Sequence, residues 1–172
     1  MKTLFIGGVK SGKSHHAENY ILDNLKFNIH NSKLLPPVYL ATSEPFDEEM
    51  KQKIEQHRAD RSEHFLTIEE PLNLSASLEP VKSPVLIECM TVWMNNMLHH
   101  GFTQEDILKQ IEKLIEVDHD LVFVLNDVGS GVIPDNALAR EFVNLSGVVA
   151  QQLAAGCDEV YHCIAGIATK IK

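Results

Sequence analysis

The stretch Met1-Lys-Thr-Leu-Phe-Ile-Gly-Gly-Val-Lys-Ser-Gly-Lys-Ser14 decides the fold. Its apolar residues 4–6 predict a buried strand, and the residues after them match G-x-x-x-x-G-K-[ST], the phosphate-binding loop. The glycines let the backbone turn tightly and bring its N–H groups close to an anion. Because residues from Lys13 onward have a helical pattern, the positive end of a helix dipole is expected at the same point. The segment therefore predicts a nucleoside triphosphate site.

Two side chains of this loop have specific expected roles. Lys13 is expected to act catalytically by reaching the β- and γ-phosphates, and the Ser14 hydroxyl is expected to ligate Mg²⁺. The other residues predicted to contact the nucleotide here are Gly7, Gly8, Val9, Lys10, Ser11 and Gly12.

The composition restricts the class of protein. The chain has 172 residues, which predicts one domain over residues 1–172. Its net charge of −9 argues against nucleic-acid binding, because the phosphate backbone attracts a basic surface. No apolar run approaches the length of a membrane span, and no signal peptide is evident. The three cysteines form no C-x-x-C pair, which is typical of reduced residues in a cytoplasmic protein.

Apolar runs that predict strands alternate with helical patterns along the chain. This alternation predicts an α/β fold of the P-loop NTPase, RecA-like type, in which a mostly parallel central sheet has helices on both faces. The expected strands are 3–6, 38–41, 85–88, 121–125 and 160–164. The expected helices are 13–25, 46–60, 91–98, 104–117 and 135–155, and residues 26–37 are expected to form a loop.

Polar residues at the carboxyl ends of these strands are candidate ligand contacts, because ligands of open α/β sheets bind there. Thr42 and Ser43 follow the second strand, although an ordinary polar turn explains them equally well. Glu88 ends the third strand and is the candidate for holding Mg²⁺, directly or through water; the alternative is a cap for the next helix. Asn126 and Asp127 begin a glycine-containing loop that is either a binding loop or a plain connection.

The predicted helix 46–60 carries a histidine on its apolar face. Phe46, Met50, Ile54 and His57 share that face by helical spacing. Such a histidine is either a core residue or a sheltered imidazole that reacts with phosphate, and the pattern alone favours the core residue. Arginine beside it, as at Arg61, is what a phosphoryl or nucleotidyl intermediate needs for charge neutralisation.

Taken together, these motifs resemble the bifunctional adenosylcobinamide kinase/adenosylcobinamide-phosphate guanylyltransferase family of cobalamin biosynthesis, over nearly the whole chain. The segments that carry the resemblance are Gly7 to Ser14 with Ala17-Glu18, Ala41-Thr-Ser43, Asp47-Glu-Glu-Met50 through Ile54, His57, Arg58 and Arg61, Glu88-Cys89, Asn126 to Asn136 with Ala137-Leu-Ala-Arg140, and Gly166-Ile167 through Lys170-Ile-Lys172.

The resemblance implies two reactions. A nucleoside triphosphate, GTP or ATP, phosphorylates adenosylcobinamide, and GTP then guanylylates adenosylcobinamide phosphate to give adenosylcobinamide-GDP. His57 matches the histidine that carries GMP in the family, which reverses the preference for a core residue. The resemblance further implies a homotrimer and these nucleotide contacts: Ala41, Thr42, Ser43, Arg58, Ala59, Asp60, Arg61, Glu69 and Glu88.

Three positions depart from the family pattern. Lys10 replaces an arginine and loses its bidentate fork, Asp127 replaces a glutamate, and Ser62 replaces a proline. Two other functions remain open at this point. A P-loop kinase for another small molecule would leave His57 unused, and a regulatory module would bind nucleotide without transferring any group.

Overall fold

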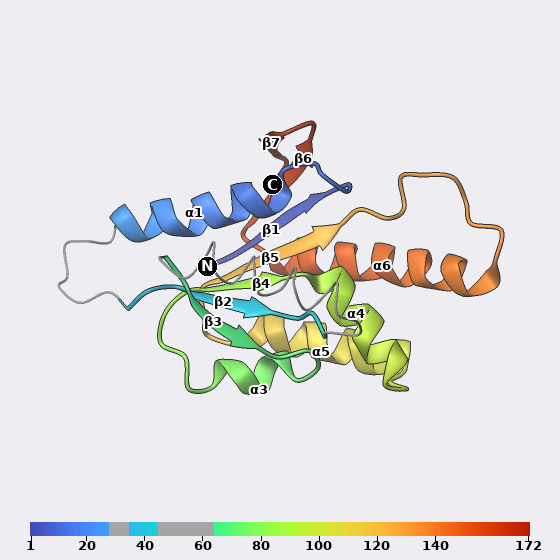
Figure 1. Cartoon of the computed structure of the whole chain (residues 1–172), viewed down its shortest axis with the longest axis horizontal. Coiled ribbons are helices and arrows are strands. Elements are labelled where there is room, and N and C mark those ends of the chain that lie inside the picture. The colour runs from blue at the N-terminus through green and yellow to red at the C-terminus, as the bar shows by residue number, and fades with distance from the viewer. Residues whose placement is uncertain (28–34, 45–63) are drawn as a thin grey trace.

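A computed structural model describes residues 1–27, 35–44 and 64–172 of the chain. A single sheet of seven strands organises them (Figure 1). The strands are β1 (Lys2–Gly7), β2 (Val38–Ala41), β3 (Leu66–Glu69), β4 (Val85–Glu88), β5 (Leu121–Asn126), β6 (Glu159–Ile164) and β7 (Ile167–Lys170). The described helices are α1 (Lys13–Phe27), α3 (Leu74–Leu78), α4 (Met90–His99), α5 (Gln104–Glu116) and α6 (Ala137–Gly156).

The strand order is β3-β2-β4-β5-β1-β6-β7, and only β7 runs antiparallel to its neighbour. The expected α/β class with a mostly parallel sheet is therefore confirmed. β1 lies between β5 and β6, and β5 separates β1 from β4. The carboxyl ends of these strands consequently meet at one edge of the sheet, where the phosphate-binding loop and the acidic end of β4 are neighbours.

Alternate side chains of the buried strands supply two apolar cores, one on each face of the sheet. Leu4 of β1 belongs to the larger core, which it shares with Trp93 of α4 and Leu145 of α6. Its neighbour Phe5 belongs to the smaller core, where it packs with Ile21 of α1. This alternation follows from the two-residue period of a strand, and it places helices on both faces of the sheet.

Several elements differ from the sequence-based expectation. α1 continues to Phe27, so the predicted loop 26–37 begins later than expected, and residues 28–34 lie outside the described part. β3, α3 and β7 were not predicted. β3 and β7 are the two edges of the sheet, and their exposed residues, including Leu66 and Ile167, give no continuous apolar run.

The last residue of α6 is a glycine for a steric reason. Gly156 was expected at the end of this helix, and it is the last helical residue, with Cys157 following in extended conformation. A Cβ on Gly156 would lie 2.6 Å from Cγ2 and 2.7 Å from Cδ1 of Ile115 in α5. Ile115 is β-branched and cannot turn away freely. Gly156 is therefore required by the close packing of α5 against α6.

The carboxylate of Glu159, at the start of β6, accepts hydrogen bonds from three side chains on α1, β6 and β7. The hydroxyls of Tyr20 and Tyr161 donate to Glu159 Oε2 at 2.8 and 3.0 Å, and Lys170 Nζ donates to Oε1 at 2.5 Å. The Lys170 hydrogen bond is the main cause that lowers the pKa of Glu159 below its ordinary value of 4.5. Burial, together with the neighbouring carboxylate, raises the pKa of Tyr161 to about 12.

Replacing Gly156 with alanine is expected to lower the free energy of unfolding by about 1–3 kcal/mol, because the new methyl group overlaps Ile115. The control is Gly147→Ala in the same helix, where no atom lies within 4 Å of the added Cβ. That change should raise stability by about 0.5–1 kcal/mol, because alanine favours a helix. Urea unfolding of both variants measures the difference, and equal stability of the two would refute the packing argument.

Glu159 is expected to make the stability of the fold sensitive to acid. Because its folded-state pKa is lowered, the stabilisation is present above the unfolded value of 4.5 and is lost as the pH falls through the folded value. In Glu159→Gln this pH dependence should disappear. Urea unfolding at about pH 7 and about pH 3 tests the difference, with Glu105→Gln, an exposed carboxylate of α5, as control. Parallel pH profiles for wild type and Glu159→Gln would contradict the prediction.

Candidate active site

The phosphate-binding loop lies at the carboxyl end of β1 and closes as a tight turn. The amide of Ser11 donates to the carbonyl of Gly8 at 3.2 Å, and the amide of His16 donates to the carbonyl of Gly12 at 3.0 Å. Lys10 and Gly12 both have positive φ, at 60° and 90°. Such a left-handed turn directs successive N–H groups to one side of the loop, which is the arrangement that binds an anion.

The turn between β6 and β7 holds this loop from one side. A Cβ on Gly7 would lie 2.3 Å from the carbonyl oxygen of Cys163, so only glycine fits there. The amide of Gly166 donates to the carbonyl of Ser11 at 3.0 Å, and His16 Nε2 lies 2.8 Å from the Gly166 carbonyl oxygen. Sequence reasoning did not find this contact, because 150 residues separate its two sides.

Lys13 lies directly over the turn. Its side chain is only 8% exposed, and Nζ donates to the carbonyl of Gly8 at 3.3 Å. A cation is thus held beside the same N–H groups that are oriented toward an anion. This placement agrees with the role expected for Lys13 at the phosphates.

Ser14 and Glu88 meet across the sheet edge. The Ser14 hydroxyl donates to Glu88 Oε1 at 2.9 Å, although 74 residues separate the two in sequence. The strand order explains the contact, because only β5 lies between β1 and β4. Hydroxyl and carboxylate oxygens side by side are the donor set that a hard cation such as Mg²⁺ prefers. The pair therefore fits the predicted metal site in both its chemistry and its place beside the phosphate loop.

Two further predicted contacts lie level with Glu88 in the sheet. Ala41, at the end of β2, pairs in register with Glu69 of β3 on one side and with Glu88 of β4 on the other. Sequence alone does not distinguish Glu69 from Glu70. In the structure, Glu70 Oε1 accepts the amides of Leu72 and Asn73 at 2.8 and 2.7 Å, so Glu70 stabilises a local turn. Glu69 is the acid that shares the row with Glu88.

Thr42 is completely buried and connects the ends of β2 and β4. Its amide donates to the carbonyl of Glu88 at 2.9 Å, and its hydroxyl oxygen accepts the amide of Cys89 at 2.9 Å. Asn96 of α4 donates to the Thr42 carbonyl at 2.6 Å. These bonds hold Glu88 in position. Ser43, the next residue, is partly exposed. Ser43 can therefore contact a ligand with its side chain, whereas the buried Thr42 has no exposed surface.

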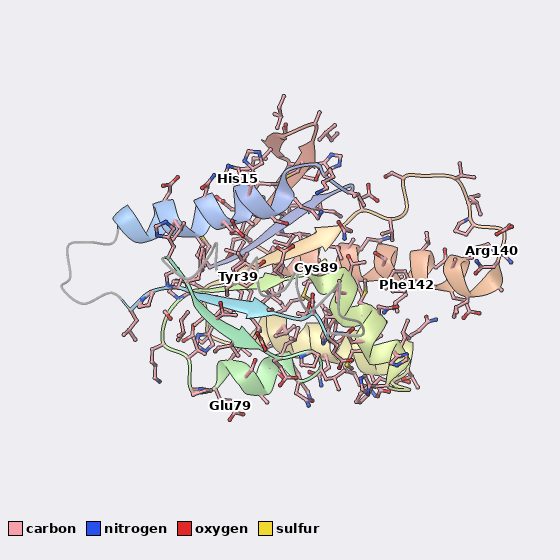
Figure 2. The ribbon with its side chains drawn as sticks, viewed as in Figure 1. His15, Tyr39, Glu79, Cys89, Arg140 and Phe142 are labelled. Carbon is pink, nitrogen blue, oxygen red and sulfur yellow. The ribbon has the colours of Figure 1, made fainter. Side chains whose placement is uncertain are left out.

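The first residues after β5 are also anchored at this edge. The amide of Asp127 donates to the carbonyl of Gly7 at 3.0 Å, and its carboxylate accepts the amide of Gly129 at 3.1 Å and the hydroxyl of Ser130. Asn126 lies nearby, with Nδ2 3.7 Å from the sulfur of Cys89. Cys89, labelled in Figure 2, lies where β4 leads into α4. Burial, followed by the charge of Glu88, raises the pKa of its thiol, which is therefore neutral.

The second predicted group of site residues lies outside the described part of the chain. It comprises His57, Arg58, Ala59, Asp60 and Arg61, together with the expected helix 46–60. The residues that the structure does bring together at the carboxyl edge are the phosphate loop, Ala41 to Ser43, Glu69 and Glu88.

Three observations concern the other candidates from the sequence. Within residues 1–27, 35–44 and 64–172, no three His, Cys, Asp or Glu side chains gather into a metal-binding group. The cysteines are free thiols and all three are buried. Among the described helices, none combines the length and the apolar character needed to cross a membrane.

Known proteins resemble this chain over its whole length. It matches the family described as cobinamide kinase / cobinamide phosphate guanyltransferase over residues 3–171. The bifunctional adenosylcobalamin biosynthesis protein CobU of Escherichia coli K12 is 36% identical over 191 residues, covering 100% of both chains. CobU of Salmonella typhimurium LT2 is 34% identical, again covering 100% of both, and CobP of Pseudomonas aeruginosa PAO1 is 33% identical, covering 100% of this chain and 98% of the relative. The chain belongs to the cobinamide kinase / cobinamide phosphate guanyltransferase family.

Proposed function

We propose that this chain phosphorylates adenosylcobinamide with a nucleoside triphosphate and then transfers GMP from GTP to adenosylcobinamide phosphate through a covalent adduct on His57. Family membership supports both the kinase and the guanylyltransferase activity. The observation that carries the proposal is the hydrogen bond between Ser14 and Glu88, because it joins the phosphate loop to an acidic strand end in one site.

In the kinase step, the N–H groups of the loop and the Lys13 ammonium would hold the triphosphate. Ser14 and Glu88 are the residues that would hold Mg²⁺, which when bound neutralises charge on the phosphate oxygens. The substrate hydroxyl attacks the γ-phosphorus and loses its proton to solvent, the bond from that phosphorus to the bridging oxygen breaks, and the nucleoside diphosphate leaves. The protein contributes mainly position and positive charge.

In the guanylyltransferase step, the neutral imidazole of His57 would attack the α-phosphorus of GTP. A phosphorus–nitrogen bond forms as the bond to pyrophosphate breaks. An oxygen of adenosylcobinamide phosphate then attacks the same phosphorus and displaces the imidazole, which gives adenosylcobinamide-GDP. Arg58 and Arg61 would neutralise the GMP phosphate, as guanidinium groups do best. These roles rest on the sequence motif.

The nucleotide contacts proposed beyond the phosphate loop form a continuous row. Ala41 ends β2, Thr42 and Ser43 follow it, and Glu69 and Glu88 flank Ala41 on the adjacent strands. This register supports their assignment to one ligand. Ala59 and Asp60 complete the set from the His57 segment by the family motif.

We further propose a cytoplasmic homotrimer in which residues 1–172 form one domain. The trimer rests on the family resemblance alone. The cytoplasm is supported by the three free thiols, and the net charge of −9 supports partners other than nucleic acid.

Protein-bound label tests the role of His57. After incubation with Mg²⁺ and GTP labelled at the α-phosphate, denatured wild-type protein should carry acid-labile label, whereas GTP labelled at the γ-phosphate should leave none, because pyrophosphate departs. His57→Ala should abolish the label. His64→Ala, which removes an exposed histidine nearby in sequence, should retain it. Full labelling of His57→Ala would refute the assignment, and a plain kinase or a regulatory module would give no α-label at all.

Substitution of the acidic strand end tests the metal site. Glu88→Gln should lower kcat/KM of phosphoryl transfer to cobinamide by about 100-fold or more and raise the Mg²⁺ concentration that is needed, because a charged oxygen ligand is lost. Glu70→Gln is the matched control, since the amide keeps the oxygen that accepts the turn amides. Steady-state kinetics at several Mg²⁺ concentrations measure both variants. Unchanged kinetics in Glu88→Gln would remove Glu88 from the site.

A further inference from the structure

A cavity of about 480 Å³ lies on the side of the phosphate loop that faces β6 and β7. This volume falls within the range of roughly 300–1,000 Å³ that is typical of small-molecule sites. Three segments form its walls: the outer side of the loop, the residues after β5, and the end of β6 with its turn. The side chains of the lining include Val9, Lys10, Ser11, Asp127, His162 and Ile164.

The cavity combines exposed apolar walls with a buried polar group. Val9 on the loop is 82% exposed and Ile164 on β6 is 60% exposed, so both offer apolar surface to a ligand. The Ser11 side chain is only 6% exposed, and its hydroxyl has no hydrogen-bond partner among the described residues. A buried hydroxyl without a partner is costly, and a ligand in the adjoining cavity can supply one.

The position of the cavity follows from the strand order. Glu88 ends β4, the phosphate loop follows β1, and the cavity lies at the end of β6, in the sheet order β4-β5-β1-β6. The loop thus stands between the proposed metal site and the cavity. If Ser14 and Glu88 mark the γ-phosphate end of a triphosphate, its nucleoside end extends toward the opposite side. The cavity lies on that side.

We infer that this cavity binds the purine nucleoside of the phosphate donor in the kinase step. The inference rests on the proposed function and adds a second nucleoside position to it. During guanylyl transfer the nucleotide contacts lie toward β2, β3 and β4, at Ala41, Glu69 and Glu88. The two steps then place the nucleoside on opposite sides of one phosphate loop. In the kinase step the γ-phosphorus faces the cobinamide hydroxyl, and in the guanylyltransferase step the α-phosphorus faces His57.

The lining carries charges of both signs, because Lys10 of the phosphate loop lines the cavity together with Asp127. The Asp127 carboxylate is oriented by Gly129 and Ser130, and it accepts hydrogen bonds but cannot donate them. Asp127 therefore suits a group with hydroxyl or amino donors, such as a ribose or the edge of a base. The apolar side chains of Val9 and Ile164 suit the faces of a purine ring.

The experiment compares ligands with and without a nucleoside. Binding of ATP, GTP and inorganic tripolyphosphate is measured with Mg²⁺ for wild type, Ile164→Ser and Asp127→Asn. The control variant is Ile171→Ser, because Ile171 has a similar exposure of 64% but does not line the cavity. Ile164→Ser should weaken ATP about five- to tenfold through lost apolar contact, and tripolyphosphate should bind as in wild type. Ile171→Ser should bind all three ligands normally.

Two activity measurements complete the test. The KM for ATP in cobinamide phosphorylation should rise in Ile164→Ser with kcat nearly unchanged, whereas the α-label on the protein from GTP should form as in wild type. Equal loss of ATP and tripolyphosphate affinity, or normal ATP affinity in both cavity variants, would overturn the inference. Parallel loss of α-label would show one nucleoside position for both steps and would overturn it too. Because binding is measured directly, the two proposals can fail separately. Absence of both activities would refute the proposed function, and the ATP affinity of the variants would still show whether the cavity binds the nucleoside.

Discussion

The contact between the phosphate-binding loop and the β6–β7 turn is the constraint on which the rest of the site depends. Gly7 has no space for a Cβ beside the Cys163 carbonyl, and Gly166 bonds to the loop at Ser11. This contact keeps the loop in the left-handed turn that orients its N–H groups. α1 begins directly after this loop at Lys13, and Ser14 in its first turn reaches Glu88 at the end of β4.

The features that could be predicted from the sequence are those determined by residues close together in the chain. The phosphate loop, the strands 38–41 and 85–88, and the start of α5 at Gln104 are correct, because apolar periodicity and caps act over a few residues. β3 and β7 could not be predicted, since each is a short edge strand that forms only when a partner strand is present. Gly156 was correctly placed at a helix end, but packing against Ile115 explains it better than helix termination does.

The candidate site shows the same division. Its residue types could be predicted from local motifs, but their contacts depend on the strand order, which brings Ser14 within hydrogen-bond distance of Glu88. The choice of Glu69 over Glu70 needs the register of β3, and the connecting role of Thr42 needs its complete burial between two strand ends. His57 remains a prediction of the family motif, because its segment lies outside the described residues.

The central place of β1 has a consequence for synthesis on the ribosome. β1 pairs with β5 and β6, so that Lys2 meets Leu121 and Thr3 meets Glu159. A nascent chain emerges from its amino-terminal end, and β1 must wait for partners that are translated much later. The contact between His16 and Gly166 spans 150 residues and requires the β6–β7 turn, which is translated later still. The phosphate loop thus completes its contacts only after nearly all of these residues have been translated.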